Sequence, residues 1–256
     1  MRPPAALAAA LALCAFVAAP AVAEIRITPK DVSAATEDDD SALSAGDDSA
    51  IADPLEDVNR GVFAFNEVVD GHLLKPVAAA WRDNAPDRAQ SVLHNFVSNL
   101  LEPWTFVNDL LQGNPGRAAD TLGRFAINTT YGLGGAFDVL GDEGNKKRST
   151  DFGETLGAWG VGGGAYLVLP LLGPSSLRDG VGEVADMAGD PVSWATGPID
   201  PAFSWARVGG SGLDKRVHHL DDLDDLEKNS IDYYAALRSA WWQMRQAEIK
   251  QSQEAR

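Results

Sequence analysis

Residues 155–177 read TLGAWGVGGGAYLVLPLLGPSSL and carry no charged side chain over 23 positions. A helix needs roughly 20 apolar residues to cross a bilayer, so the stretch is long enough. Its six glycines and the prolines Pro170 and Pro174 disfavour one continuous helix. Irregular backbone at membrane depth persists only where protein or a water-filled cavity surrounds it. The stretch therefore predicts either a segment that sits in or against lipid without crossing it, or a buried loop and short helix in a globular core.

The remaining sequence is dominated by apolar residues at helical spacing, which predicts an all-α fold. Sustained apolar–polar alternation bounded by hairpin turns does not occur, so we do not expect an antiparallel sheet. Amphipathic helices of this kind either pack into a core or lie in the plane of a membrane interface, and periodicity does not distinguish the two. The apolar stripes run from Val58 to Val69, from Val92 to Leu101 with an expected end at Pro103, from Trp104 to Leu111, from Ala118 to Ala126, from Leu213 to Leu220, and from Ile231 to Met244.

The first residues have the pattern of a secretory signal peptide. Arg2 provides a charged start, an apolar run follows, and Ala21-Val22-Ala23 is a small-residue cleavage site. Cys14 is the only cysteine, but Leu13 is large where an acylation signal has a small residue. We therefore expect export and cleavage after residue 23, without attachment of a lipid. The expected organisation is a signal peptide over 1–23, an acidic disordered tail over 24–50, a helical domain over 51–212 and a C-terminal helical segment over 213–256.

Charge and motif content exclude several classes of function. The formal net charge is −16, whereas nucleic-acid phosphates need a basic surface. Ser175 and Ser176 lack the G-x-S-x-G elbow of a serine nucleophile. Adjacent His218 and His219 point to different sides of a helix, and His94 is isolated in the sequence. We therefore expect no catalytic residue, no metal site and no cofactor.

A series of ordered motifs resembles the MlaA (VacJ) family. The first is Asp53-Pro54-Leu55-Glu56-Asp57-Val58-Asn59-Arg60, followed by Phe63-Ala64-Phe65-Asn66. The match is dense over roughly 53–194 and looser over 233–245, and so many blocks in one order are more specific than any single motif. Further blocks are 75–78, 95–96, 99–100, 102–103, Asn108 with 111–113, 124–125, 128–129, 132–135 with Asp138, 152–153, 155–157, 159–161, 166–170, 173–175 and 178–179.

The resemblance implies a ring of short amphipathic helices that lies in the membrane plane around a central amphipathic channel. It also implies intermembrane phospholipid transport, in which misplaced phospholipids leave the outer leaflet of the outer membrane for a soluble periplasmic lipid-binding protein. The implied location is the inner leaflet, on the periplasmic face, beside a trimeric porin. Two alternatives are a structural porin-associated scaffold and a hydrolase of envelope lipids.

The expected lipid-binding residues lie in two of the matched regions. On the first predicted helix, the Phe65-Asn66 pair is expected either near the lipid path or in helix packing. In the uncharged stretch, three consecutive aliphatic residues are expected to face lipid, and two amphipathic aromatics suit an interface. The full set is Phe63, Phe65, Asn66, Trp159, Tyr166, Leu167, Val168 and Leu169.

Overall fold

The computed structural model describes residues 51–141, 147–196 and 201–256. The expected signal peptide, its cleavage site and the acidic tail lie outside these residues.

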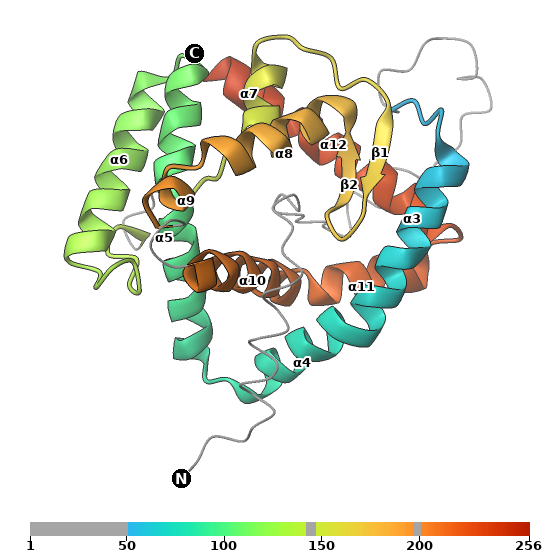
Figure 1. Ribbon diagram of the computed structural model, residues 1–256, viewed down its shortest axis with the longest axis horizontal. Coiled ribbons are helices and arrows are strands. Elements are labelled where there is room, and N and C mark those ends of the chain that lie inside the picture. The colour runs from blue at the N-terminus through green and yellow to red at the C-terminus, as the bar shows by residue number, and fades with distance from the viewer. Residues whose placement is uncertain (1–50, 142–146, 197–200) are drawn as a thin grey trace.

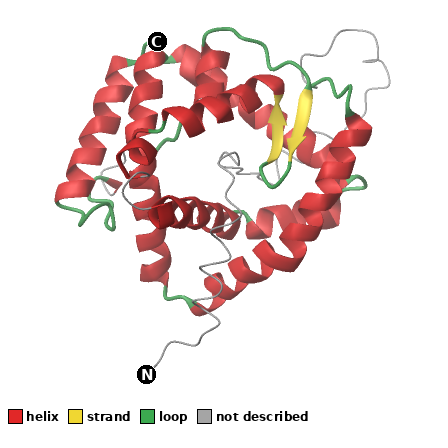
Figure 2. Ribbon diagram, viewed as in Figure 1, coloured by secondary structure: helices red, strands yellow, loops and turns green. Residues whose placement is uncertain are grey.

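The described chain is mostly helical, which confirms the all-α class (Figures 1 and 2). Its elements are α3 (Glu56–Val69), the π-helical turn η1 (Asp70–Leu74), α4 (Lys75–Asn84), α5 (Asp87–Leu111), α6 (Pro115–Thr130), α7 (Phe152–Ala158), β1 (Tyr166–Leu169), β2 (Gly173–Ser176), α8 (Leu177–Gly189), α9 (Pro191–Thr196), α10 (Pro201–His218), α11 (Leu220–Asn229) and α12 (Tyr233–Glu254).

Figure 1 shows these elements arranged around a central region rather than stacked in layers. Helix α6 packs on α5, α7 packs on α8 and α12, and α10 contacts both α4 and α5. The expected boundary at 212/213 falls inside α10, which continues to His218. The C-terminal elements are therefore part of the same arrangement, since α12 also contacts β2.

Helix α5 differs from the expectation that Pro103 ends it. The helix runs for 25 residues through this proline. A proline inside a helix removes one backbone donor and clashes with the preceding turn, so continuation needs support from packing. Helix α6 provides it beside the C-terminal half of α5, where the buried Asn99 amide donates to Thr129 Oγ1 at 3.0 Å and Asp109 accepts from Thr121 Oγ1 at 2.7 Å.

A two-stranded antiparallel hairpin, β1–β2, corrects the expectation of no sheet. Tyr166 pairs with Ser176 and Leu169 pairs with Gly173. The alternation in β1 spans only four residues, too few for the sequence pattern to stand out. At the tip, Leu171 has φ of 65° and Gly173 has φ of 82°, the left-handed region that glycine accepts freely and leucine does not.

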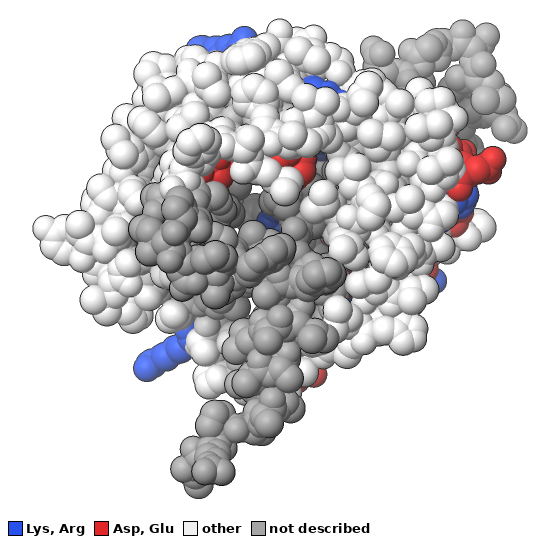
Figure 3. All heavy atoms as spheres, in the orientation of Figure 1, with Lys and Arg blue, Asp and Glu red and all other residues white. Residues whose placement is uncertain are grey.

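The distribution of side chains is the reverse of that in a typical soluble protein, with many polar residues buried and many large apolar residues exposed. Among the residues that the structure describes, the buried apolar clusters are small, one around Tyr166, Tyr234 and Trp241 and one around Ala78, Leu213 and Leu220. Many large apolar side chains are exposed instead, and the face in Figure 3 is almost free of charge where it is described. Contiguous exposed apolar surface marks a site of contact with membrane or partner.

Helix α8 shows this inversion within one element. Its buried face carries Arg178, Asp179 and Glu183, whereas Val181 and Val184 on the other face are 57% and 66% exposed. Among the described residues, no helix combines the length and apolar character needed to cross a bilayer.

Candidate functional site

Two asparagines one helical heptad apart on α3 hold the hairpin. The Asn59 amide donates to the Tyr166 carbonyl at 3.1 Å, and its oxygen accepts from Val168 N at 2.9 Å. Asn66 repeats this at the tip, donating to the Leu169 carbonyl at 3.0 Å and accepting from Leu171 N at 2.7 Å. Each carboxamide thus satisfies backbone groups that a two-stranded hairpin leaves unpaired.

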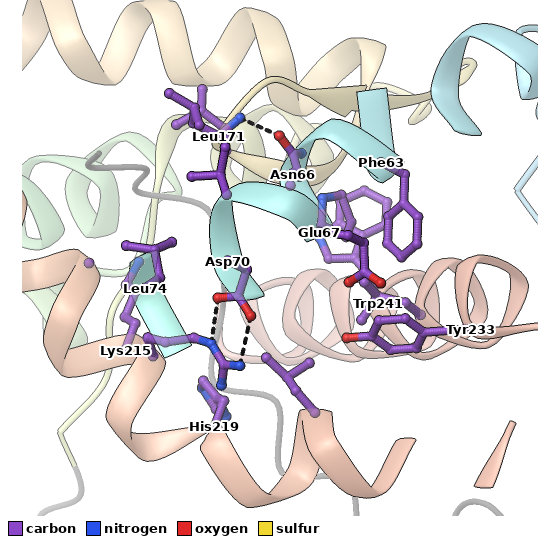
Figure 4. A pocket seen from close by; sticks show the side chains of 18 residues that line it. Phe63, Asn66, Glu67, Asp70, Leu74, Leu171, Lys215, His219, Tyr233 and Trp241 are labelled. Carbon is purple, nitrogen blue, oxygen red and sulfur yellow. Dashed lines mark hydrogen bonds and ion pairs between the residues drawn. The ribbon is translucent and has the colours of Figure 1, made fainter. Parts of the chain in front are cut away.

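The hairpin tip and α3 form one wall of a cavity of about 160 Å³. Figure 4 shows Phe63 and Asn66 on this wall, with Tyr233 and Trp241 approaching from α12. Phe63 packs edge-on against both Tyr233 and Tyr234, with ring centroids 5.4 Å apart in each pair. The other apolar lining residues are Val69, Leu74, Leu171, Leu172, Pro174, Leu223 and Leu237.

Charged groups from α10 and η1 border this apolar cavity. Arg216 forms a two-pronged ion pair with Asp70, at 2.7 and 2.8 Å (Figure 4). Lys215 lies beside it among the lining residues. Burial lowers the pKa of the Lys215 amine, and the carboxylates of Glu183 and Asp151 oppose that shift. Since Glu67 and Asp70 also line the cavity, its edge carries both acidic and basic groups around an apolar interior.

A second, acidic pocket adjoins the first, because Pro174 and Trp241 line both. Burial raises the pKa of Glu183 to about 8 and that of Asp186 to about 7, and neighbouring carboxylates add to both shifts. In Figure 3, acidic and basic side chains appear at the central hollow of a face that is otherwise nearly uncharged. The two pockets together make an interior with apolar, cationic and acidic parts.

Arg245 from α12 lines the acidic pocket and holds two of its carboxylates in place. It donates to Asp179 Oδ1 at 2.8 Å and to Asp151 Oδ1 at 2.5 Å, and Glu248 accepts from it at 3.0 Å. Asp179 also accepts from Ser176 Oγ at 2.5 Å, and Ser176 caps α8 by accepting from Asp179 N. The Ser176 hydroxyl is thus engaged in a structural cap.

The structure divides the eight expected lipid-binding residues into four pairs, of which the last, Tyr166 and Val168, is buried. Phe63 and Asn66 line the apolar cavity. Phe65 and Trp159 are exposed, with 51% and 49% of their surfaces accessible. Leu167 and Leu169 are half-buried.

The expectation that Val168 faces lipid is wrong, because it is 5% exposed in the cluster around Trp241. Tyr166, expected at an interface, is buried there too, at 1%. Residues alternate between the two faces of a strand, so β1 cannot present three consecutive side chains to one environment.

Sequence reasoning missed most of the cavity. Tyr233 and Trp241 lie on a helix recognised from its apolar stripe, but nothing in that stripe indicated that α12 lies opposite α3. Lys215 and Glu183 carried no sequence signal at all, because a single charged residue in an amphipathic helix is ordinarily solvated.

Comparison with known proteins agrees with this architecture. The sequence profile described as "MlaA lipoprotein" matches residues 51–248. Relatives in Shigella flexneri and Escherichia coli (strain K12), each named "Intermembrane phospholipid transport system lipoprotein MlaA", are 40% identical over 206 residues, covering 79% of this chain and 80% of each relative. A solved chain from work on the "Structural basis for maintenance of bacterial outer membrane lipid asymmetry" is 39% identical with a TM-score of 0.66, over 77% of this chain and 99% of that one. The chain belongs to the MlaA lipoprotein family.

Proposed function

We propose that this protein carries phospholipid through the interior of its helical ring, as part of an intermembrane transport system that maintains the lipid asymmetry of the outer membrane. The names of the relatives support the system to which it belongs. The observation that carries the proposal is the inverted distribution of polarity, with apolar side chains on the outside and charged groups within.

The apolar exterior supports residence in one leaflet. Val181, Val184 and Met187 of α8 stand exposed, as do Phe65 and Val68 of α3. Burying a large aliphatic side chain in an apolar medium contributes roughly 1.5–3 kcal/mol, so several such residues hold a protein in lipid. We infer that the ring lies in the inner leaflet of the outer membrane, open to the periplasm.

The interior supports passage of an amphipathic molecule. The apolar cavity is smaller than the roughly 300–1,000 Å³ of pockets that enclose a drug-sized ligand, so it accommodates part of a lipid, such as a segment of an acyl chain. Lys215 is placed to attract a lipid phosphate, and the carboxyl oxygens of the neighbouring Glu183 and Asp186 can accept hydrogen bonds from a headgroup amine.

The remaining parts of the proposal concern partners and chemistry. We propose a trimeric porin beside the ring and a soluble periplasmic lipid-binding protein as the acceptor, both as implied by the family. Transport rather than catalysis is the activity; the use of the Ser176 hydroxyl as a helix cap supports this over a lipid hydrolase.

Reversal of charge in the interior tests the proposal. Lys215→Glu places a carboxylate where a lipid phosphate is expected, next to Glu183, whereas Lys228→Glu makes the same change at an exposed position of α11. In cells lacking the native protein, outer-leaflet phospholipid should stay elevated with Lys215→Glu and return to normal with Lys228→Glu, at matched abundance. Equal complementation by both variants would favour the porin-associated scaffold, which needs no lipid path.

A further inference from the structure

A cluster of two histidines and one carboxylate joins α5 to α10 on a different face of α10 from the one that lines the cavity. His94 of α5 places Nδ1 2.9 Å from Asp214 Oδ2. His218 lies one turn after Asp214 on α10, and its ring centroid is 4.6 Å from that of His94. One potential ligand atom from each residue can be chosen so that all lie within 4.8 Å of one another. His94, isolated in the sequence, therefore has Asp214 and His218 as neighbours in the fold.

The hydrogen bond of His218 leaves its other ring nitrogen with a free lone pair. Its Nδ1 lies 2.8 Å from the backbone carbonyl of Asp214. A carbonyl only accepts, so Nδ1 carries the proton and, in the neutral ring, Nε2 keeps its lone pair. Metal-binding histidines commonly donate their other N–H to a carbonyl or carboxylate, which fixes the tautomer and the ring orientation.

The exposure of the two histidines and the types of the three possible ligands indicate which class of cation this cluster could bind. The side chains of His94 and His218 are 34% and 49% exposed, which gives a cation a path from solvent, while Asp214 is 10% exposed. Imidazole suits zinc and its transition-metal neighbours, whereas Mg²⁺ and Ca²⁺ prefer sets of oxygen ligands. Lys147 and Lys215 both interact electrostatically with Asp214 and oppose any cation there, so the two imidazoles must supply most of the affinity.

We propose that His94, Asp214 and His218 form a binding site for a divalent transition metal, with Zn²⁺ as the expected occupant. Three protein ligands leave a fourth, tetrahedral position to water or to a group from a partner. The bound ion ties α10 to α5. Since Lys215 and Arg216 of α10 border the cavity, metal occupancy would hold that wall in place. The proposal does not depend on what the cavity carries.

The histidine content of the chain provides matched controls. It has four histidines, His72, His94, His218 and His219. His72 repeats the local bonding of His218, with Nδ1 2.9 Å from the carbonyl of Val68 one turn earlier, but it lies outside the cluster. The protein is purified in detergent with a tag free of histidine, stripped with chelator and titrated with Zn²⁺ by calorimetry. His94→Gln, His218→Gln and His72→Gln are compared, with circular dichroism in chelator to establish that each is folded.

The unmodified protein and His72→Gln should bind one Zn²⁺ with equal affinity, and Mg²⁺ should not compete. His94→Gln and His218→Gln should each bind at least about tenfold more weakly, the lower end of the loss seen when even a supporting residue of a metal site is removed. Zn²⁺ should also raise the melting temperature of the first two proteins only. Absence of zinc binding in the unmodified protein, or an affinity in His94→Gln and His218→Gln equal to that of His72→Gln, would overturn the proposal.

Discussion

Replacement of Asn66 by leucine removes the side chain that holds the hairpin tip without a large change in volume. The variant loses two hydrogen bonds, one to the Leu169 carbonyl and one from Leu171 N. A hydrogen bond contributes about 0.5–1.5 kcal/mol net, so the loss is about 1–3 kcal/mol. The tip is prone to open because Leu171 holds a left-handed backbone conformation that costs about 1–2 kcal/mol for a residue with a side chain.

Amide hydrogen exchange at Leu171 measures this directly, because Asn66 accepts from that amide. A loss of about 1–3 kcal/mol corresponds to exchange about 5- to 150-fold faster than in the unmodified protein. Exchange in the adjacent variant Phe65→Leu should stay unchanged, since Phe65 points outward. Because Leu171 and Leu172 line the cavity, Asn66→Leu should also alter phospholipid transport in cells. Unchanged protection of Leu171 would refute the assignment of Asn66 as the anchor of the tip.

Three further predictions concern burial, the protonation of a buried carboxyl and the processing of the N-terminus. Val184 is exposed on the apolar exterior, so Val184→Asp should leave the fold helical by circular dichroism but reduce retention in membranes. Val168→Asp should prevent folding, because it buries an unpaired carboxylate. Equal effects of the two variants would contradict the placement of Val184 outside and Val168 inside. Burial raises the pKa of Glu183 to about 8 from an ordinary 4.5, so between these pH values the folded state holds a proton that the unfolded chain has released, and stability falls as pH rises. Glu183→Gln should therefore flatten the fall in melting temperature between pH 5 and pH 8. An unaltered slope would argue against a protonated Glu183 in the folded state. Although its relatives are named lipoproteins, intact mass should show a mature chain beginning at Glu24, and a lipid-modified Cys14 at the N-terminus would contradict this.

Helical periodicity predicted the longer helices α3, α5, α6 and α12, because burial of one face leaves a repeating pattern in the sequence, but it did not predict the shorter α4, α7, α8 and α9. It could not predict which face is turned outward. In α8 the apolar positions Val181 and Val184 look the same in sequence whether they enter a core or meet lipid. That choice depends on the solvent, which the sequence does not specify.

The cavity was less predictable than the elements. Phe63, Lys215 and Trp241 meet there from α3, α10 and α12, which are far apart along the chain. Asn66 was identified through its motif, but its role in holding the hairpin depends on a strand too short for its alternation to be recognised.

Blocking the cavity with a single chemical group tests the central claim most directly, that phospholipid passes through the interior of the ring. A chain beginning at Glu24 has no cysteine, so Leu223→Cys in the cavity wall and Val184→Cys on the apolar exterior each carry one reactive thiol. Cells are treated with a bulky maleimide, labelling is verified by mass, and outer-leaflet phospholipid is measured. The account predicts that phospholipid accumulates after labelling at position 223 and stays normal after labelling at position 184. Normal lipid asymmetry with position 223 fully labelled would contradict it.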